Sequence, residues 1–300
     1  MNTIELNKVR KTYDQFVAVD DLSFSIEQGA VFGLLGPNGA GKTSSIRMMI
    51  GITAPDAGSI NVFGQPFERK ALHRIGYLPE ERGLYKKMKI LDQLIFLGEL
   101  HGLSVAVARQ KAISWSERLE ISEWLPKKVE ELSKGMQQKI QFVATLLHDP
   151  EFIIMDEPFG GLDPVNATLL KDVLLDLKKQ GKTILFSTHR MDQVEKLCDA
   201  ICLINHGKAV LNGNLKEIKA GYGKNNVQIE YEGDAGFLQQ TALITSFNDY
   251  GNYVEAKLAP GADPQQLLRL VVERARVTRF ELMEPSLEEI FTEVVGKTDA

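Results

Sequence analysis

The chain has 300 residues, of which 44% are hydrophobic, so it can bury the core of one large domain or of two ordinary ones. Its formal net charge of −5 argues against a general nucleic-acid-binding protein, which carries a basic excess, and we expect no nucleic-acid partner. The two cysteines, Cys198 and Cys202, fit a reducing compartment and are expected to be small core residues.

The hydropathy of the sequence indicates the cellular compartment of the protein. The first residues, MNTIELNKVRKTY, lack the apolar stretch of a signal peptide. No window approaches the roughly 18 uninterrupted apolar residues of a membrane span. We therefore expect a cytoplasmic protein, and any membrane-spanning part of its function would belong to another chain.

The first half of the chain predicts strands, then a helical insert. Residues 2–30 show the two-residue period of half-buried strands, and residues 30–35 form a short, fully apolar strand. Residues 42–51 are expected to be helical, and residues 52–64 return to turns and a strand. From about residue 88 to residue 148, apolar side chains recur at the three-four spacing of helices.

The next segments alternate strands with helices. Buried strands are predicted in EFIIMDEP and KTILFSTH, helices in PVNATLLKDVLLDLKKQG and RMDQVEKLCD, and a hairpin in AICLINHGKAVLNG. This alternation predicts a mostly parallel α/β core, to which the early antiparallel strands and the helical insert are added.

A second domain is predicted after the break AGYGKNN, which is rich in Gly and Asn. Beyond it the order strand, helix, two strands, helix, strand and a final helix predicts a small α+β domain of the ferredoxin-like type. We therefore predict a first domain at residues 1–218 with a helical subdomain at about 85–150, a linker at 219–226 and an accessory domain at 227–300.

The segment GPNGAGKTSS joins a predicted buried strand to a predicted helix and fits the phosphate-binding pattern G-x-x-x-x-G-K-[ST]. Successive backbone N–H groups can wrap a polyphosphate there, and the helix N-terminus adds a favourable dipole. Lys42 adds a full charge, Thr43 can offer its hydroxyl to Mg²⁺, and the spacing does not match the dinucleotide-binding G-x-G-x-x-G. The residues expected to bind a nucleoside triphosphate are Gly36, Pro37, Asn38, Gly39, Ala40, Gly41, Lys42, Thr43 and Ser44.

Two adjacent acids follow the strand that ends in MDEPFGGLDP. Asp156 stands where a strand-end acid can hold Mg²⁺ through water. Glu157 can take a proton from a water aimed at the γ-phosphate. His189 follows the next predicted strand and can contact the γ-phosphate. Taken alone, such an acidic pair can be a solvated cap and such a histidine a surface residue, so these assignments depend on the motifs around them.

The segment ELSKGMQQK, residues 131–139, lies between the helical insert and the acidic strand. With GPNGAGKT before it and MDEP after it, this segment strongly resembles the signature loop of ATP-binding-cassette (ABC) ATPases. The motifs follow the family's order over most of residues 2–217. The resemblance implies a P-loop ATPase fold, binding of ATP and Mg²⁺, and ATP hydrolysis. It also implies that Ser133 and Gly135 meet a phosphate.

The same resemblance assigns three further residues. Tyr13, in KTYDQFVAVDDLSF, looks like the aromatic residue that stacks on adenine, although it can also be a tyrosine on a strand surface. Asp163, in GGLDP, looks like the aspartate of the D-loop, and His189 looks like the switch histidine.

The chain departs from the family's pattern in two places. The signature reads LSKGM where the commonest form is LSGGQ, so Lys134 and Met136 are substitutions. In IGYLPEERGLY, Glu80 stands where the glutamine of the Q-loop falls. A carboxylate 4 Å from a phosphate charge costs about 4 kcal/mol at an effective dielectric of 20, and Mg²⁺ offers about twice that in attraction. We therefore expect Glu80 either close to the metal, as a catalytic and metal-binding residue, or turned away from the nucleotide.

Both departures, together with the tail MEPSLEEIF, resemble one subfamily. Its members are the ATP-binding subunits of bacterial exporters, associated with sodium or antibiotic extrusion, and they carry an extra C-terminal domain. The resemblance implies a dimer of cassettes sealed by ATP, since the signature loop of one subunit closes the phosphate loop of another. It also implies a separate membrane permease that docks near residues 80–105, and a location on the inner face of the cell membrane.

Two other functions remain open. The first is a soluble ABC ATPase that acts on ribosomes or DNA, which the single cassette, the lack of long coiled coils and the acidic balance disfavour. The second is a regulatory module whose C-terminal domain senses a small molecule. The cargo cannot be read from this chain, because cargo contacts would belong to the membrane protein.

Overall fold

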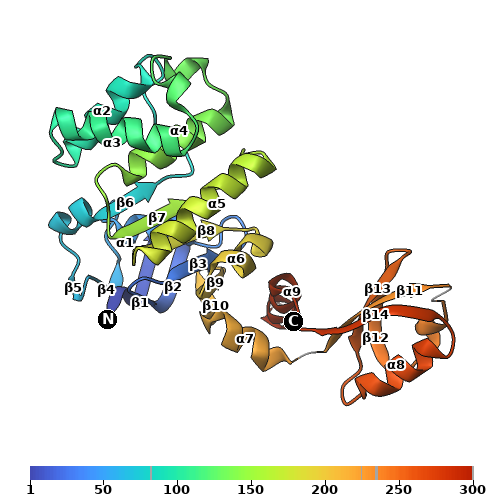
Figure 1. Cartoon of the computed structure of the whole chain (residues 1–300). Coiled ribbons are helices and arrows are strands. Elements are labelled where there is room, and N and C mark those ends of the chain that lie inside the picture. The colour runs from blue at the N-terminus through green and yellow to red at the C-terminus, as the bar shows by residue number, and fades with distance from the viewer. Residues whose placement is uncertain (82, 224, 234–235, 299–300) are drawn as a thin grey trace. The chain divides into compact units, whose positions relative to one another are not determined.

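The computed structural model describes residues 1–300 except residues 82, 224, 234–235 and 299–300 (Figure 1). The chain divides into two compact units, Met1–Gly213 and Asn214–Ala300. Each unit encloses its own hydrophobic core, which is the physical criterion for a domain.

A six-stranded sheet forms the centre of the first unit, with the strand order β10-β9-β3-β8-β7-β6 (Figure 1). The neighbours from β9 to β6 pair in parallel, which confirms the predicted α/β core. β3, β7 and β8 are buried along their whole length, and their continuous apolar sequences reflect that burial. The strands are β3 (Val31–Leu35), β6 (Ile75–Leu78), β7 (Phe152–Asp156), β8 (Thr183–Thr188), β9 (Ala200–Asn205) and β10 (Lys208–Asn214).

A second sheet in this unit has the order β2-β1-β4-β5. β1 pairs antiparallel with both β2 and β4, and buried residues alternate with exposed ones in β2, as the two-residue period predicts. The turn between β1 and β2 brings Tyr13 opposite Phe16. The strands are β1 (Asn2–Tyr13), β2 (Phe16–Glu27), β4 (Ala57–Val62) and β5 (Gln65–Pro66).

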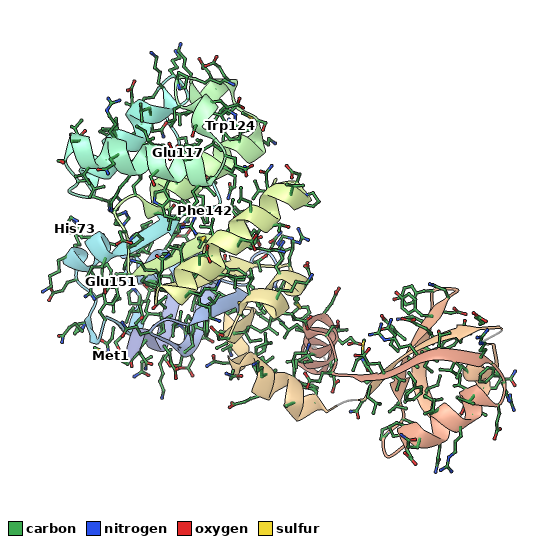
Figure 2. All side chains as sticks on the ribbon, in the orientation of Figure 1. Met1, His73, Glu117, Trp124, Phe142 and Glu151 are labelled. Carbon is green, nitrogen blue, oxygen red and sulfur yellow. The ribbon has the colours of Figure 1, made fainter. Side chains whose placement is uncertain are left out.

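The helices of the first unit include the predicted helical insert. α2, α3 and α4 contact one another and form the helical insert (Figure 1). Phe142 of α4, labelled in Figure 2, has 0% exposed surface. Among the described residues, none of the helices has the length and apolar character that crossing a bilayer requires. The helices are α1 (Lys42–Met49), α2 (Ile90–Leu100), α3 (Val105–Arg118), α4 (Lys134–Leu146), α5 (Pro164–Lys179) and α6 (Met191–Leu197).

The strand β6 is a feature that the sequence patterns do not predict. It has four residues, IGYL, without alternation, and it follows the 3₁₀ turn η1 (Arg69–Arg74). β6 pairs with β7 and stands last in the sheet order, so a neighbour far along the chain decides its conformation. Its position matters because residues 79–81 leave its carboxyl end and carry Glu80.

The second unit contains a four-stranded sheet in the order β12-β13-β11-β14. β11 pairs antiparallel with both β13 and β14, which is the predicted ferredoxin-like arrangement. A 3₁₀ turn stands in place of the first predicted helix. The elements are β11 (Asn226–Glu232), η4 (Gly236–Gln240), β12 (Ile244–Asp249), β13 (Tyr253–Leu258), α8 (Pro264–Val272), β14 (Arg276–Met283) and α9 (Leu287–Thr298).

A helix covers part of the predicted linker at 219–226. α7 (Leu215–Tyr222) extends into that segment, and β11 begins at Asn226. Asn214 caps α7, since its side-chain oxygen accepts hydrogen bonds from the backbone N–H groups of the second and third residues of the helix. The Gly- and Asn-rich composition therefore marks the end of this helix as well as the start of a connection.

Candidate active site

The carboxyl edge of the central sheet holds a cavity of about 350 Å³. Loops that follow β3, β6, β7 and β8 line it, together with the turn between β1 and β2. Such an edge is where ligands bind in α/β sheets. The predicted residues that line the cavity are Tyr13, Asn38, Gly39, Gly41, Lys42, Thr43, Ser44, Glu80, Asp156, Glu157 and His189.

Two glycines of the phosphate loop are required by the packing of the loop itself. A Cβ on Gly36 would lie 2.2 Å from the carbonyl oxygen of Ile204, and a Cβ on Gly41 would lie 2.4 Å from that of Ala18. Gly39 also has a positive φ, but its Cβ would meet nothing within 4 Å. The sequence argument explains these glycines by access for an anion, and the structure adds close approach to the neighbouring strands.

The remaining loop residues, Gly36, Pro37 and Ala40, do not line the cavity. Lys42 is 7% exposed, and its ammonium donates to the carbonyl oxygens of Gly36, at 2.8 Å, and Pro37, at 3.1 Å. These bonds hold the lysine inside its own loop.

Burial and the neighbouring carboxylates act on the pKa of Lys42 in opposite directions. Burial lowers the pKa of the Lys42 ammonium from its ordinary value, and nearby carboxylates oppose that shift. In decreasing order of effect, these carboxylates belong to Glu157, Asp156 and Glu80. Glu80 lines the same cavity as Lys42.

Asp156 is the most deeply buried acid of the site, with 1% of its surface exposed. Its Oδ2 accepts from the hydroxyl of Thr43 at 3.0 Å, and its Oδ1 accepts from the hydroxyl of Ser187. The pair predicted to hold a metal, Thr43 and Asp156, is thus already in contact. Ser187, at the end of β8, is a support that the sequence reasoning missed, because it lies 31 positions from Asp156.

Glu157 follows β7 with a φ of 50°, a left-handed conformation that is uncommon for a residue with a side chain. Its Oε2 accepts from the Thr188 hydroxyl at 3.0 Å. Its Oε1 lies 2.7 Å from Nδ1 of His189 and accepts from the backbone N–H of His189 at 3.0 Å. The structure therefore brings the predicted base and the predicted switch histidine together, and Thr188 is a further contact that the sequence did not indicate.

The mouth of the cavity carries two exposed aromatic rings. Tyr13 is 38% exposed and Phe16 is 62% exposed. Both line the cavity, so either ring is available to a planar base. Phe16 was missed by the sequence reasoning, although an aromatic residue on each side of a two-residue turn is a signal that could have found it.

Three predicted residues outside the phosphate loop also lie outside this cavity: Ser133, Gly135 and Asp163. Ser133 caps α4 and accepts from the backbone N–H of Met136, and Asp163 caps α5 in the same way. Backbone and side-chain hydrogen bonds from Asn166 lower the pKa of the Asp163 carboxyl. Gly135 packs beside the D-loop, where an added Cβ would lie 3.0 Å from the carbonyl oxygen of Gly161.

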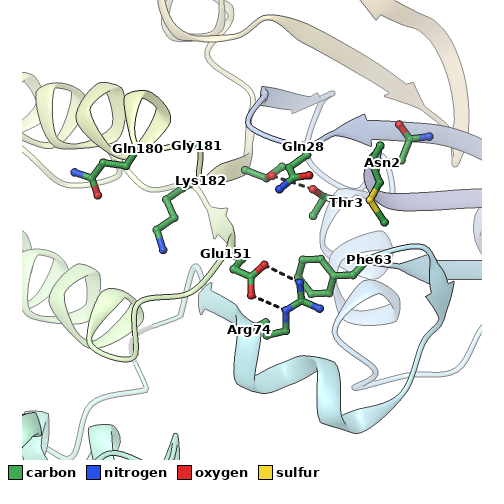
Figure 3. A pocket seen from close by; sticks show the side chains of 11 residues that line it. Asn2, Thr3, Gln28, Phe63, Arg74, Glu151, Gln180, Gly181 and Lys182 are labelled. Carbon is green, nitrogen blue, oxygen red and sulfur yellow. Dashed lines mark hydrogen bonds and ion pairs between the residues drawn. The ribbon is translucent and has the colours of Figure 1, made fainter.

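A further cavity of about 430 Å³ lies near the opposite, amino ends of β7 and β8 (Figure 3). Its charged side chains are already paired, since Arg74 donates to both carboxylate oxygens of Glu151 at 2.6 Å and Lys182 pairs with Asp149. Arg74 also covers the ring of Phe63 (Figure 3). None of the predicted site residues lines this cavity, so the chemistry is concentrated at the carboxyl edge.

Comparison with known proteins shows the family of the chain. Residues 19–160 match the ABC transporter family, and residues 213–295 match the C-terminal domain of DrrA1-3-like ATP-binding proteins. The chain is 46% identical to the uncharacterized ABC transporter ATP-binding protein YhaQ of Bacillus subtilis (strain 168), over 98% of each protein. It belongs to the ABC transporter ATP-binding proteins. As a member of this family of ABC ATPases, it binds and hydrolyses ATP.

Two other comparisons extend this result. The linearmycin resistance ATP-binding protein LnrL of Bacillus subtilis (strain 168) is 31% identical over 98% of this chain and 99% of its own length. A solved structure of an ATP-binding subunit of an ABC transporter has a TM-score of 0.69 and 28% identity, over 74% of this chain and 93% of its own. These similarities confirm the predicted ABC ATPase fold and the resemblance to exporter subunits.

Proposed function

We propose that this ABC ATPase works as a dimer with ATP and Mg²⁺ and powers a separate membrane permease that exports its cargo. The observation that carries the proposal is the cluster of Lys42, Thr43, Asp156, Glu157 and His189 around one cavity. Support for export comes from the relatives, which include LnrL and a Nod factor export ATP-binding protein of Paraburkholderia xenovorans (strain LB400) that is 40% identical over 70% of each chain.

The oxygen atoms of Thr43 and Asp156 suit Mg²⁺. They are hard ligands in mutual contact at 3.0 Å, and Mg²⁺ usually takes one or two protein oxygens and completes its shell with phosphate and water. Among the described residues no three His, Cys, Asp or Glu side chains form a ready metal centre, which accords with a metal that depends on the nucleotide. Glu80 is proposed as an additional acid beside that metal.

Glu157 is proposed as the general base. Its carboxylate is held from two sides by Thr188 and His189, so it has a fixed orientation toward the cavity. Glu157→Gln keeps the shape of the side chain but cannot take up a proton, and we expect ATP turnover to fall at least ~10²-fold while ATP binding is retained. Unchanged turnover in a phosphate-release assay would remove Glu157 from this role.

Lys42 is proposed to bind the outer phosphates. Lys42→Ala removes the buried ammonium from the loop, so we expect it to weaken ATP binding itself, as measured by fluorescence with a labelled nucleotide. Normal ATP affinity in Lys42→Ala would contradict the proposed phosphate site. The pair of variants separates binding from chemistry, because Glu157→Gln is expected to change only the second.

A dimer is proposed because Ser133, Gly135 and Asp163 lie outside the cavity that holds Lys42. In the proposed assembly these residues act on the nucleotide of the other cassette. The hydroxyl of Ser133 and the N-terminus of α4 are suited to a phosphate. Glu157→Gln with ATP and Mg²⁺ should therefore elute as a dimer in size-exclusion chromatography, and a monomer under these conditions would argue against the arrangement.

A membrane partner is proposed on the inner face of the cell membrane, near residues 80–105. Tyr85 and Leu100 in this region are 56% and 62% exposed, which supports a contact surface. The test is affinity capture of tagged Glu157→Gln from native membranes in mild detergent with ATP and Mg²⁺. Recovery of a polytopic membrane protein supports a transporter, whereas recovery of ribosomes or DNA-associated proteins supports a soluble ATPase.

A further inference from the structure

The helix α4 is bonded to the segment that carries Glu80. Gln141 of α4 is buried, with 5% of its surface exposed. Its amide Nε2 donates to the carbonyl oxygen of Pro79 at 3.1 Å and to that of Glu81 at 3.3 Å. These two carbonyl groups flank Glu80, so one side chain holds the backbone on both sides of that acid.

Two neighbouring side chains of α4 make contacts of the same kind. The hydroxyl of Thr145, one turn further along, donates to the carbonyl oxygen of Gln141 at 2.9 Å and lies 3.3 Å from that of Tyr77. The amide of Gln138, one turn earlier, donates to the carbonyl oxygen of Pro158 at 3.1 Å, directly after Glu157. The buried face of α4 thus reaches the backbone beside Glu80 and Glu157, two of the three acids that line the cavity.

The same helix begins at the signature loop. Ser133 caps α4, and Gln141 follows eight residues later, a distance of about 12 Å at 1.5 Å per residue. A helix of this length moves as a rigid element. A displacement of the signature loop therefore either carries the Glu80 segment with it or breaks the two hydrogen bonds of Gln141.

We propose that Gln141 is a positioning residue that fixes the Glu80 segment to α4, so that the signature loop and Glu80 change position together. The inference rests on the proposed function, in which Glu80 acts on the nucleotide of its own subunit and the signature loop acts on that of the other. Gln141 then links the two nucleotide sites of the dimer through one helix. It acts through Glu80 and does not touch the nucleotide.

The direct test is Gln141→Met, which keeps the length of the side chain and removes the donated hydrogen bonds. The amide oxygen of Gln141 has no hydrogen-bond partner among the described residues, so these bonds are what the substitution removes. Gln93→Met is the matched control. Gln93 lies in α2, is 0% exposed, and its amide bonds to none of the described residues.

The measurement is steady-state ATP hydrolysis by the full chain. We expect Gln141→Met to lower kcat about tenfold, because the backbone that carries Glu80 loses both hydrogen bonds from α4, with a change in KM of less than about threefold. Gln93→Met should stay within about twofold of the unmodified chain. If Gln141→Met does not fold, as judged by circular dichroism, Gln141→Asn replaces it, since it keeps the amide but shortens its reach.

A double-mutant comparison separates positioning from a general structural role. In a Glu80→Ala background, Gln141→Met should lower kcat by less than about twofold, because the group that it positions is gone. An undiminished loss in that background overturns the inference, as does an unchanged kcat in Gln141→Met alone or an equal loss in Gln93→Met. An unmodified chain without ATP hydrolysis would refute the proposed function as well, whereas the other negative results refute only this inference.

Discussion

The substitution Gly41→Ala tests whether close contact with the neighbouring strand β2 constrains the conformation of the phosphate loop. Gly41 has a φ of +108°, and an added Cβ would lie 2.4 Å from the carbonyl oxygen of Ala18, whereas real Cβ contacts rarely come within 3.4 Å. A left-handed conformation costs a residue with a Cβ about 1–2 kcal/mol. Forcing an extra carbon against the backbone costs a further 1–3 kcal/mol, so we expect Gly41→Ala to lower the free energy of unfolding by about 2–5 kcal/mol.

Gly39→Ala is the matched control in the same loop. Gly39 also has a positive φ, of +80°, but its added Cβ would meet nothing within 4 Å. Only the conformational cost applies, so the expected loss is about 1–2 kcal/mol. The comparison isolates the contact with the Ala18 carbonyl, because both variants gain the same methyl group.

The assay is urea unfolding without nucleotide, followed by tryptophan fluorescence. Trp115 and Trp124 both lie in the first unit, so the signal reports on the unit that contains the loop. Equal losses of stability in the two variants would refute the packing argument and leave access for the anion as the reason for both glycines. ATP affinity, measured in parallel, should fall more in Gly41→Ala than in Gly39→Ala.

Two further predictions concern stability alone. Burial against the stacked ring of His101 lowers the pKa of His148 from 6.5 to about 4, so in that pH range the unfolded chain binds a proton that the folded chain does not. Stability should therefore fall as the pH drops from about 7 to about 5, by ~1–2 kcal/mol after allowance for partial solvent exposure, and His148→Phe should make that fall smaller in urea unfolding at both pH values. Burial also lowers the pKa of His101, so part of the fall should remain. Asp263→Ala removes the cap of α8, in which the carboxylate accepts from the backbone N–H of Gln265. It should cost the second unit about 1 kcal/mol in calorimetry without changing ATP affinity, and an altered affinity would mean that the C-terminal unit contributes to the site.

Contiguous motifs made most of the nucleotide site predictable. The phosphate loop and the acidic strand end each occupy a single short segment, so the order of residues along the chain is enough to recognise them. Parallel pairing of the buried strands then brings their carboxyl ends to one edge of the sheet, which is why Lys42, Asp156 and His189 meet. The ferredoxin-like unit was likewise predictable from the order of its elements.

The sequence by itself therefore determined the fold class, the family and the residues proposed to face the nucleotide, because each of these depends on local pattern. Only the tertiary structure decided which side chains support them. Ser187 and Thr188 hold the two acids across 31 positions, and Gln141 holds the Glu80 segment from about 60 positions away. Contacts between residues so far apart depend on how strands and helices pack, and packing leaves no periodic trace in the sequence.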